Sequence, residues 1–148
     1  MSGDAQLART QKPYGPVDPN KVQYGPLGHD VDAQGFTARQ LSRLDEALTL
    51  SSRESGLTFS IYVGELKPPS RAHAEALFEK LTDDAVLLAV SPGQRTLHIV
   101  TGPASAKRLP NRACALAALA MRAAFTSGEL TGGLVTGLRM LSDSAGRI

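Results

Sequence analysis

Apolar residues first recur at helical spacing about a quarter of the way along the chain. They are leucines three and four positions apart: Leu41, Leu44 and Leu48. Thr37 stands before them with Gln40 three positions later, which predicts a capping box, and Phe36 can pack on Leu41 as a hydrophobic staple. Gly56 is a natural C-terminal stop. The pattern predicts a first helix that begins after Thr37 and ends at Gly56.

Three later segments carry the apolar patterns of strands. LTFSIYV at residues 57–63 alternates apolar and polar residues, which predicts a half-buried strand. AVLLAV at residues 85–90 does not alternate, as expected of a strand covered on both faces. RTLHIVTG at residues 95–102 follows a turn with Pro92 and Gly93 at its centre, and therefore returns antiparallel.

A second helix is expected between the first two of these strands. Its apolar side consists of Ala74, Leu77, Phe78 and Leu81. Pro68 and Pro69 break the chain before it, and Ser70 can cap it. The order strand, helix, strand predicts a βαβ crossover with parallel strands. We therefore expect a mixed sheet of at least three strands with residues 85–90 in the middle.

The C-terminal third reads as two helices. Pro110 marks the start of the alanine-rich NRACALAALAMRAAF, and the following GELTGGLVTGLRML keeps its leucines on one side. That second segment contains Gly132, Gly133 and Gly137, and each glycine inside a helix costs about 1 kcal/mol relative to alanine. Close contact with the alanine face of the preceding helix explains them. Alternatively, one or more glycines lie in a break before the helix begins.

Together these elements predict an α/β sandwich over residues 36–148. Its small mixed sheet has a βαββ core and is flanked by about four helices. Residues 1–35 contain four prolines and five glycines without apolar periodicity, which predicts a disordered arm.

Within the arm the tripeptide Tyr-Gly-Pro occurs twice, ten residues apart, at Tyr14 and Tyr24. One interpretation is a doubled linear motif in which both tyrosines contact a protein partner. The alternatives are chance in a segment rich in proline and glycine, or a tail that docks on its own domain.

Composition narrows the classes of function. A net charge of +2 in 148 residues is too small to indicate nucleic-acid binding. No apolar run approaches the roughly 18 residues of a membrane span, and the polar N-terminus lacks the apolar region of a signal peptide. We therefore expect a cytoplasmic protein. The single cysteine, Cys114, cannot close an internal disulfide and agrees with a reducing compartment.

One acidic and one basic cluster are expected at the same end of the sheet. Asp83 and Asp84 precede the central strand, and the loop after the antiparallel strand carries Lys107, Arg108 and Arg112. The two aspartates also follow the end of a helix, where the helix dipole disfavours negative charge. They are candidate ligands of Mg²⁺ or Ca²⁺, and the basic loop is a candidate anion or ion-pair site. The plainer alternative is solvated turn aspartates with a loose surface ion pair.

Other chemistry-bearing residues form no recognised motif. The three histidines show no zinc spacing, and His98 reads as a partly buried or edge histidine more than as a catalytic one. Cys114 lacks the arginine of a Cys-x5-Arg phosphatase and reads as a small core residue. No Walker-type glycine loop is present.

Several phrases in this order resemble the TPM domain family. They are FTARQLSRLDEAL at the first helix, LTFSIYV, Asp83-Asp84-Ala85-Val86 in place of the family's Asp-Asn-Gly-Val, and FTSGELTGGL near the end. The resemblance covers about residues 36–143. It implies an α/β sandwich, with acid phosphatase activity and divalent-cation binding for some relatives and protein partners for others. Of the cation motif only Asp83 matches directly, so the resemblance does not carry the site over intact.

No complete catalytic set accompanies these features. We therefore expect an accessory or protein-interaction module, without a cofactor unless Mg²⁺ or Ca²⁺ binds the aspartates. The alternative function is a divalent-metal-assisted phosphatase of phosphomonoesters, with Asp83 and Asp84 at the cation.

Overall fold

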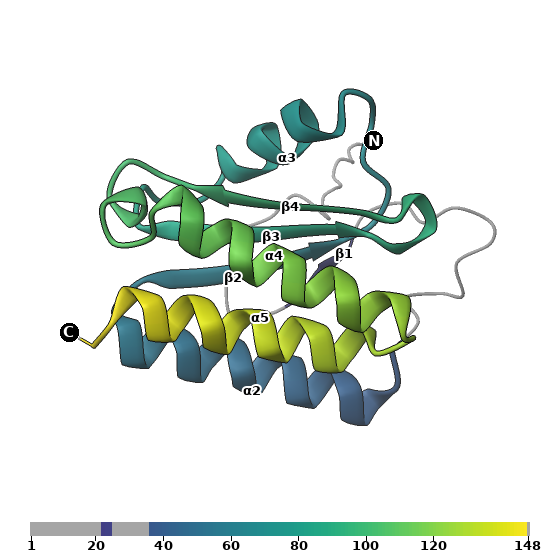
Figure 1. Cartoon of the computed structure of the whole chain (residues 1–148). Coiled ribbons are helices and arrows are strands. Elements are labelled where there is room, and N and C mark those ends of the chain that lie inside the picture. Colours follow the sequence, from purple (N-terminus) through teal and green to yellow (C-terminus); the bar gives the residue numbers. More distant parts are fainter. Residues whose placement is uncertain (1–21, 25–35, 148) are drawn as a thin grey trace, which may run out of the picture.

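The computed structural model describes residues 22–24 and 36–147, which form a mixed α/β fold (Figure 1). One sheet has the strand order β1-β2-β3-β4. Its strands are β1 (Gln23–Tyr24), β2 (Thr58–Val63), β3 (Ala85–Ser91) and β4 (Thr96–Thr101). The first three are mutually parallel and β4 is antiparallel to β3. The predicted mixed sheet around residues 85–90 is confirmed.

In the described part of the chain, four α-helices cover the two faces of the sheet unequally. They are α2 (Ala38–Ser55), α3 (Ser70–Phe78), α4 (Asn111–Thr126) and α5 (Leu130–Ala145). Figure 1 shows α3 alone on one face, with α2, α4 and α5 on the other. Two short 3₁₀ turns, Pro92–Gln94 and Ser105–Lys107, complete the connections. The α/β sandwich with about four flanking helices is confirmed.

The first helix has the predicted ends. Thr37 accepts the N–H of Gln40 at 3.1 Å, and the Gln40 side chain accepts the Thr37 N–H at 2.8 Å, so the capping box is complete. Gly56 follows the helix with φ of 79°, the left-handed conformation that glycine adopts without steric cost. Sequence alone therefore located both ends of α2.

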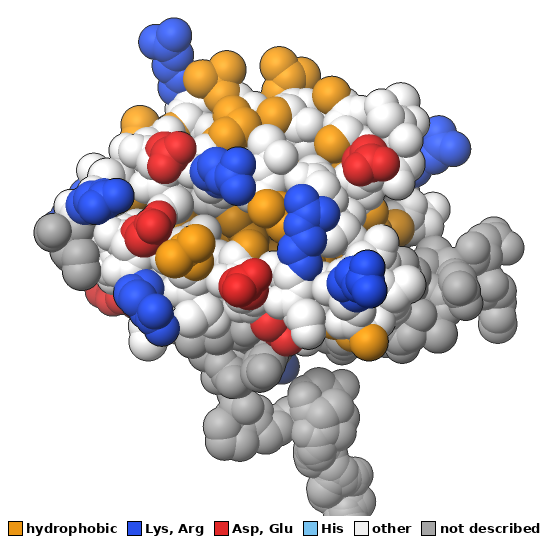
Figure 2. All heavy atoms as spheres, turned by 90° about the horizontal axis from the view of Figure 1, so that it is seen from below, with side chains coloured by type: hydrophobic (Ala, Val, Ile, Leu, Met, Phe, Trp, Pro, Cys, Tyr) orange, Lys and Arg blue, Asp and Glu red, His pale blue; other side chains and the backbone are white. Residues whose placement is uncertain are grey.

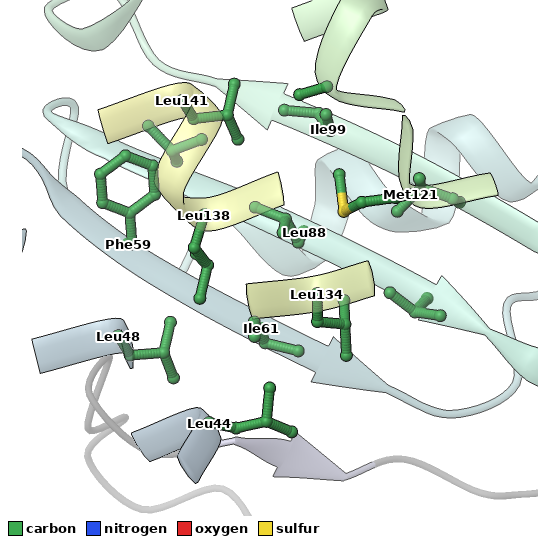
Figure 3. Packing of buried hydrophobic residues seen from close by; sticks show 14 of the residues in the cluster. Leu44, Leu48, Phe59, Ile61, Leu88, Ile99, Met121, Leu134, Leu138 and Leu141 are labelled. Carbon is green, nitrogen blue, oxygen red and sulfur yellow. The ribbon is translucent and has the colours of Figure 1, made fainter. Parts of the chain in front are cut away.

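The main core lies between the sheet and the three-helix face. Leu44 and Leu48 of α2, Leu134 and Leu138 of α5 and Met121 of α4 are fully buried there (Figure 3). They pack on strand residues that face this side: Phe59, Ile61, Val63, Val86, Leu88, Val90, Leu97 and Ile99. A smaller cluster under α3 takes the opposite side of the strands, with Tyr62, Leu87, Ala89 and Val100. The central strand is therefore covered on both faces, as its unbroken apolar pattern predicted.

The prediction of a half-buried β2 is wrong. Ser60 and Tyr62, on the face expected to meet solvent, are 0% and 7% exposed. The reason is tertiary: α3 covers that face, and β1 pairs with the outer edge of β2. Ser70 also does not cap α3, because Pro69 occupies the N-cap position and no side-chain cap bond forms.

The glycine-rich last helix packs tightly on the alanine-rich one, as predicted. A Cβ added at Gly133 would lie 2.9 Å from the Ala124 Cβ, and one at Gly137 would lie 2.7 Å from the Met121 Cγ. Since α5 begins at Leu130, Gly132, Gly133 and Gly137 all lie inside the helix. The alternative, a break before the helix, is therefore wrong.

Part of the segment expected to be a disordered arm is described, namely residues 22–24. Gln23 and Tyr24 pair in parallel with Tyr62 and Val63, and the Val22 N–H donates to the Asp45 carboxylate at 3.3 Å. Residues 1–21 and 25–35, including Tyr14, lie outside the described residues. Among residues 22–24 and 36–147, no helix is both long and apolar enough to cross a lipid bilayer.

Candidate binding site at the edge strand

The start of β3 and the loop after β4 meet through their backbones. The Asp83 carbonyl accepts the N–H groups of Ala104 at 3.0 Å and Ser105 at 3.2 Å. The Ser105 hydroxyl, fully buried, donates to the Ala85 carbonyl at 2.7 Å and accepts the Gly102 N–H at 2.8 Å. Gly102 is required there, because an added Cβ would lie 2.8 Å from the Phe78 ring and 2.9 Å from the Asp83 carbonyl carbon. The acidic doublet and the loop thus lie at one end of the sheet.

The charged side chains at this end do not pair with one another. The Asp84 carboxylate accepts the Thr82 hydroxyl, and the Asp83 side chain is exposed. Arg108 turns away and donates to the carbonyls of Ser55 at 2.6 Å, Ala145 at 2.9 Å and Gly146 at 3.0 Å. A guanidinium there satisfies the free carbonyls at the C-termini of α2 and α5 and complements their dipoles. Arg108 therefore has a structural role in this fold.

The remaining basic residues of the predicted site form no ion pair with the two aspartates. Lys107 and Arg112 are exposed, and no salt bridge among the described residues joins either of them to Asp83 or Asp84. Within the described part of the chain, no group of three or more histidine, cysteine, aspartate and glutamate side chains is arranged to hold a metal ion. The cation site proposed from the sequence therefore has two candidate carboxylates and, among the described residues, no third histidine, cysteine or acidic side chain beside them.

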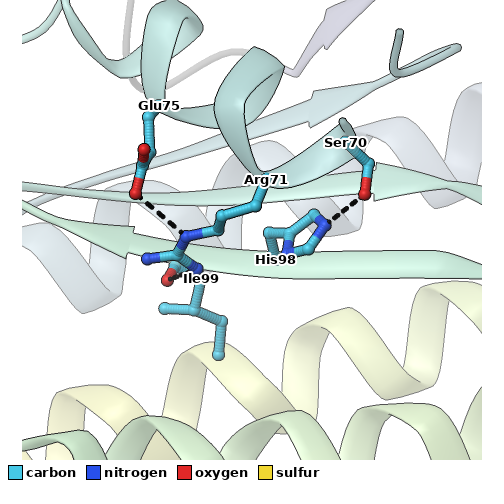
Figure 4. A network of polar contacts seen from close by, with 5 residues as sticks. All are labelled: Ser70, Arg71, Glu75, His98 and Ile99. Carbon is cyan, nitrogen blue, oxygen red and sulfur yellow. Dashed lines mark hydrogen bonds and ion pairs between the residues drawn. The ribbon is translucent and has the colours of Figure 1, made fainter. Parts of the chain in front are cut away.

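A denser set of polar contacts lies along β4, the edge strand, between α3 and α4 (Figure 4). The Ser70 hydroxyl lies 2.7 Å from Nε2 of His98. The Arg71 guanidinium donates to the Ile99 carbonyl at 3.0 Å and forms an ion pair with Glu75 at 3.2 Å. From the opposite face, Arg122 of α4 donates to the Leu97 carbonyl at 3.1 Å. Two helices thus hold the same strand edge through arginines.

Two hollows lie beside this edge and share Leu97 and Arg122 in their walls. The first, about 280 Å³, is lined by Arg71, His98, Asn111, Cys114 and their neighbours. The second, about 410 Å³, continues toward Arg95 and the end of α4. Among the described residues, neither wall contains an aspartate or glutamate, whereas together they contain Arg71, Arg95 and Arg122.

Burial and nearby arginines shift the pKa values of His98 and Cys114. Burial lowers the pKa of His98 below its ordinary value of 6.5, and the positive charges of Arg71 and Arg122 lower it further, partly offset by Glu75. Burial raises the pKa of the Cys114 thiol, against a smaller opposite effect of Arg71. A neutral imidazole and a protonated thiol are the consequence near neutral pH.

A serine hydroxyl at hydrogen-bond distance from an imidazole is also the start of a hydrolase dyad. In the described part of the chain, however, no side chain bonds to Nδ1 of His98, and Ser70 does not line either hollow. The contact joins the first residue of α3 to the edge strand. The expectation that His98 is partly buried at an edge strand agrees with its position on β4.

Sequence reasoning did not single out Arg71, Arg95 or Arg122. The one available signal was Arg122, a lone charge in the second half of an alanine-rich helix. Figure 2 looks from below, onto the side where Figure 1 places α2, and shows basic and acidic side chains interspersed with apolar ones.

Comparison with known proteins agrees with this fold and corrects the family assignment made from the sequence. A family model described as a domain of unknown function, DUF5130, matches residues 22–142. Two uncharacterized proteins of Mycobacterium tuberculosis, from strains H37Rv and CDC 1551, are 40% identical over 109 residues. The match covers 72% of this chain and 65% of each relative, so the chain spans less than two thirds of their length. The assignment to the TPM family is wrong, because the matching model is DUF5130 and not TPM.

Three solution structures share the fold at low sequence identity. The N-terminal domain of a protein from P. gingivalis has a TM-score of 0.65 at 16% identity, covering 74% of this chain and 75% of that one. The BA42 protein of Bizionia argentinensis has a TM-score of 0.64 at 18% identity, covering 74% and 81%. The N-terminal domain of a Corynebacterium glutamicum protein has a TM-score of 0.62 at 11% identity, covering 82% and 87%. At these identities the likeness concerns the fold alone.

Proposed function

We propose that this chain, which belongs to the DUF5130 family of domains of unknown function, binds another protein and performs no catalysis of its own. One observation carries the proposal: the outward face of α4 presents Leu116 and Leu119, 50% and 65% exposed. The neighbouring Ala115 and Ala123 are exposed as well. Apolar side chains gathered on one helix face are typical of protein contact surfaces.

The position of this face supports the proposal. Ala115 and Ala118 of α4 line the first hollow beside β4, so the apolar helix face continues into the polar edge of the strand. An apolar area bordered by arginines and hydrogen-bonding groups combines the two parts of a protein interface, a dry centre and a polar rim. We also propose a cytoplasmic location, which rests on the sequence and not on a feature of the fold.

The test compares two exposed-leucine variants of the whole chain. Leu116→Ser combined with Leu119→Ser alters the face of α4, whereas Leu50→Ser alters α2 at a residue that is also 50% exposed. Each variant is crosslinked in native lysate and its neighbours are quantified by mass spectrometry. We expect specific neighbours to be lost with the α4 variant and kept with Leu50→Ser. Equal neighbours for both variants and wild type would contradict the proposal.

The tyrosine motifs remain part of the same proposal. Because Gln23 and Tyr24 pair with the sheet, removal of residues 1–21 takes away Tyr14 while leaving β1 in place. Loss of the neighbours seen with the full chain supports a contribution of Tyr14 to recognition. An unchanged set of neighbours limits recognition to the remainder of the chain, which still includes Tyr24.

The alternative function is a metal-assisted phosphatase with the cation on Asp83 and Asp84, to which the described residues add no third histidine, cysteine, aspartate or glutamate ligand. Such a mechanism needs a metal-activated water and donors for the transferred group. Turnover of p-nitrophenyl phosphate with added Mg²⁺, lost in Asp83→Ala, would favour the phosphatase. We expect turnover no higher than that of a buffer blank.

A further inference from the structure

The outer edge of β4 offers backbone groups to a partner. In an antiparallel pair, alternate residues turn their N–H and C=O groups toward the neighbouring strand and the others turn them away. The arginine bonds to the carbonyls of Leu97 and Ile99 show that these two residues face outward. Their N–H groups point to the same side, and no acceptor from the described side chains reaches them. The edge therefore retains donors for another strand.

The two carbonyls on this edge are covered by charges that come from opposite faces. Arg71 reaches Ile99 from α3, and Arg122 reaches Leu97 from α4. Charged side chains at an exposed edge hinder indiscriminate pairing with other strands. A neutral strand gains no ion pair in return for displacing these guanidinium groups. A strand that carries carboxylates offers each guanidinium a new and charge-assisted partner.

We propose that the edge of β4 binds an extended acidic segment of a partner protein by strand addition, an inference that rests on the proposed protein-binding function. The segment accepts the outward N–H groups of Leu97 and Ile99 with its own carbonyls. Its carboxylates pair with Arg71 and Arg122, which release the strand carbonyls for the segment's N–H groups. Arg71 exchanges its present ion pair with Glu75 in the same step.

The geometry specifies how the acidic residues are spaced. Successive side chains of a strand point to opposite faces. Since Arg71 and Arg122 come from opposite faces of the sheet, the two carboxylates must also point to opposite faces. They are therefore separated by an odd number of positions, one or three, and not by two.

Charge also distinguishes this occupant from a second copy of the chain. Pairing of two β4 edges would bring the arginines of both copies together, and each copy would add no carboxylate beyond the Glu75 already paired with Arg71, because no aspartate or glutamate among the described residues lines either hollow. Like charges held close together disfavour such a contact. An acidic segment supplies the missing negative charge.

The test uses synthetic peptides and the full chain. The probe is a peptide of about eight residues, a common strand length, made of alternating threonine and valine with two glutamates three positions apart. Control peptides carry glutamine in place of glutamate, or glutamates two positions apart. Affinity is measured by fluorescence anisotropy, and the site by amide chemical shifts of the ¹⁵N-labelled chain.

We expect the probe to bind about tenfold or more tightly than either control peptide, with shifts concentrated at Leu97 and Ile99. Arg71→Gln combined with Arg122→Gln removes that preference. Arg43→Gln combined with Arg139→Gln, at exposed arginines of α2 and α5, leaves it unchanged and controls for the loss of two positive charges. Binding that ignores the glutamates, or shifts away from β4, overturns the proposal. The same shifts on addition of inorganic phosphate would indicate an anion pocket and would also overturn the proposal. A dimer of the chain in sedimentation would overturn it as well.

The two proposals fail separately. If the probe does not bind but neighbours still depend on Leu116 and Leu119, the protein-binding function stands and the strand-edge site is refuted. If the probe binds at β4 but the α4 variant keeps every neighbour, the apolar face is refuted as the interface.

Discussion

The Ser70 hydroxyl lies 2.7 Å from Nε2 of His98, which joins the first residue of α3 to the edge strand β4 (Figure 4). Arg71, the next residue of α3, reaches the backbone of the following strand residue, Ile99. The amino-terminal end of the short helix is thus fixed to the strand by one side-chain pair and one side-chain-to-backbone bond. This arrangement places the arginine near the imidazole, where its positive charge adds to the larger effect of burial in lowering the pKa of His98.

The first prediction concerns the pH dependence of His98. Burial first, then Arg71 and Arg122, lower its pKa from 6.5 in the folded chain. As the pH falls below 6.5, the unfolded chain takes up the proton before the folded one, so the folded state loses stability toward acid. NMR titration of the imidazole protons is expected to give a pKa below 6.5, and Arg71→Gln is expected to raise it. A wild-type pKa at or above 6.5 would contradict the assignment.

The second prediction compares neighbouring glycines of α5. A Cβ at Gly133 would lie 2.9 Å from the Cβ of Ala124, which cannot move without shifting α4. At Gly132 the nearest atom is the flexible Glu129 carboxylate, at 3.3 Å. Gly133→Ala is expected to lower the free energy of unfolding by about 1–3 kcal/mol through overpacking. Gly132→Ala is expected to raise it by about 0.5–1 kcal/mol through helix propensity.

Urea denaturation of both glycine variants measures the difference directly. A stabilising effect at both positions would show that α4 and α5 are not in the close contact described. Equal destabilisation at both would show that backbone entropy does not dominate at Gly132.

The third prediction compares two fully buried serines. The Ser60 hydroxyl has no hydrogen-bond partner among the described residues, whereas the Ser55 hydroxyl donates to the Ser51 carbonyl at 2.7 Å and accepts the Leu57 N–H at 3.1 Å. Ser60→Ala removes an unsatisfied polar group and is expected to stabilise the fold by about 1 kcal/mol. Ser55→Ala leaves the Leu57 N–H without its acceptor and costs about 1–3 kcal/mol. Thermal or urea unfolding tests both, and the same sign for the two variants would refute the comparison.

The fourth prediction separates a structural arginine from a ligand-binding one. Arg108 donates to carbonyls at the ends of α2 and α5, so Arg108→Gln is expected to cost about 1.5–3 kcal/mol. Arg139→Gln, on the exposed side of α5, is expected to change stability by no more than about 0.5 kcal/mol. Amide hydrogen exchange at the C-terminal turns of α2 and α5 should quicken only in the first variant. Unchanged stability in Arg108→Gln would contradict the structural role of Arg108. It would favour the earlier interpretation of the loop after β4 as an anion site.

Only part of the candidate site could be predicted from the sequence. The position of Asp83 beside the loop at Ala104 follows from strand order, since the start of a strand and the end of its antiparallel neighbour share one end of the sheet. The direction of Arg108 does not follow from strand order, because it depends on where the C-termini of α2 and α5 come to rest. Arg71 and Arg122 are far apart along the chain, and only the packing of their helices on opposite faces of β4 brings them to one edge.

The sequence by itself determined the local elements: the capped α2 between Thr37 and Gly56, the doubly covered β3 and the close contact of the glycine helix with the alanine helix. Each follows from periodicity, cap chemistry or side-chain size within a short segment. Only the tertiary structure decided that β1 and α3 would bury β2, and that two arginines would cover the carbonyls of β4. The physical reason is that the sequence pattern specifies which side of a helix or strand is apolar. Which other element covers that side depends on how distant parts of the chain pack together.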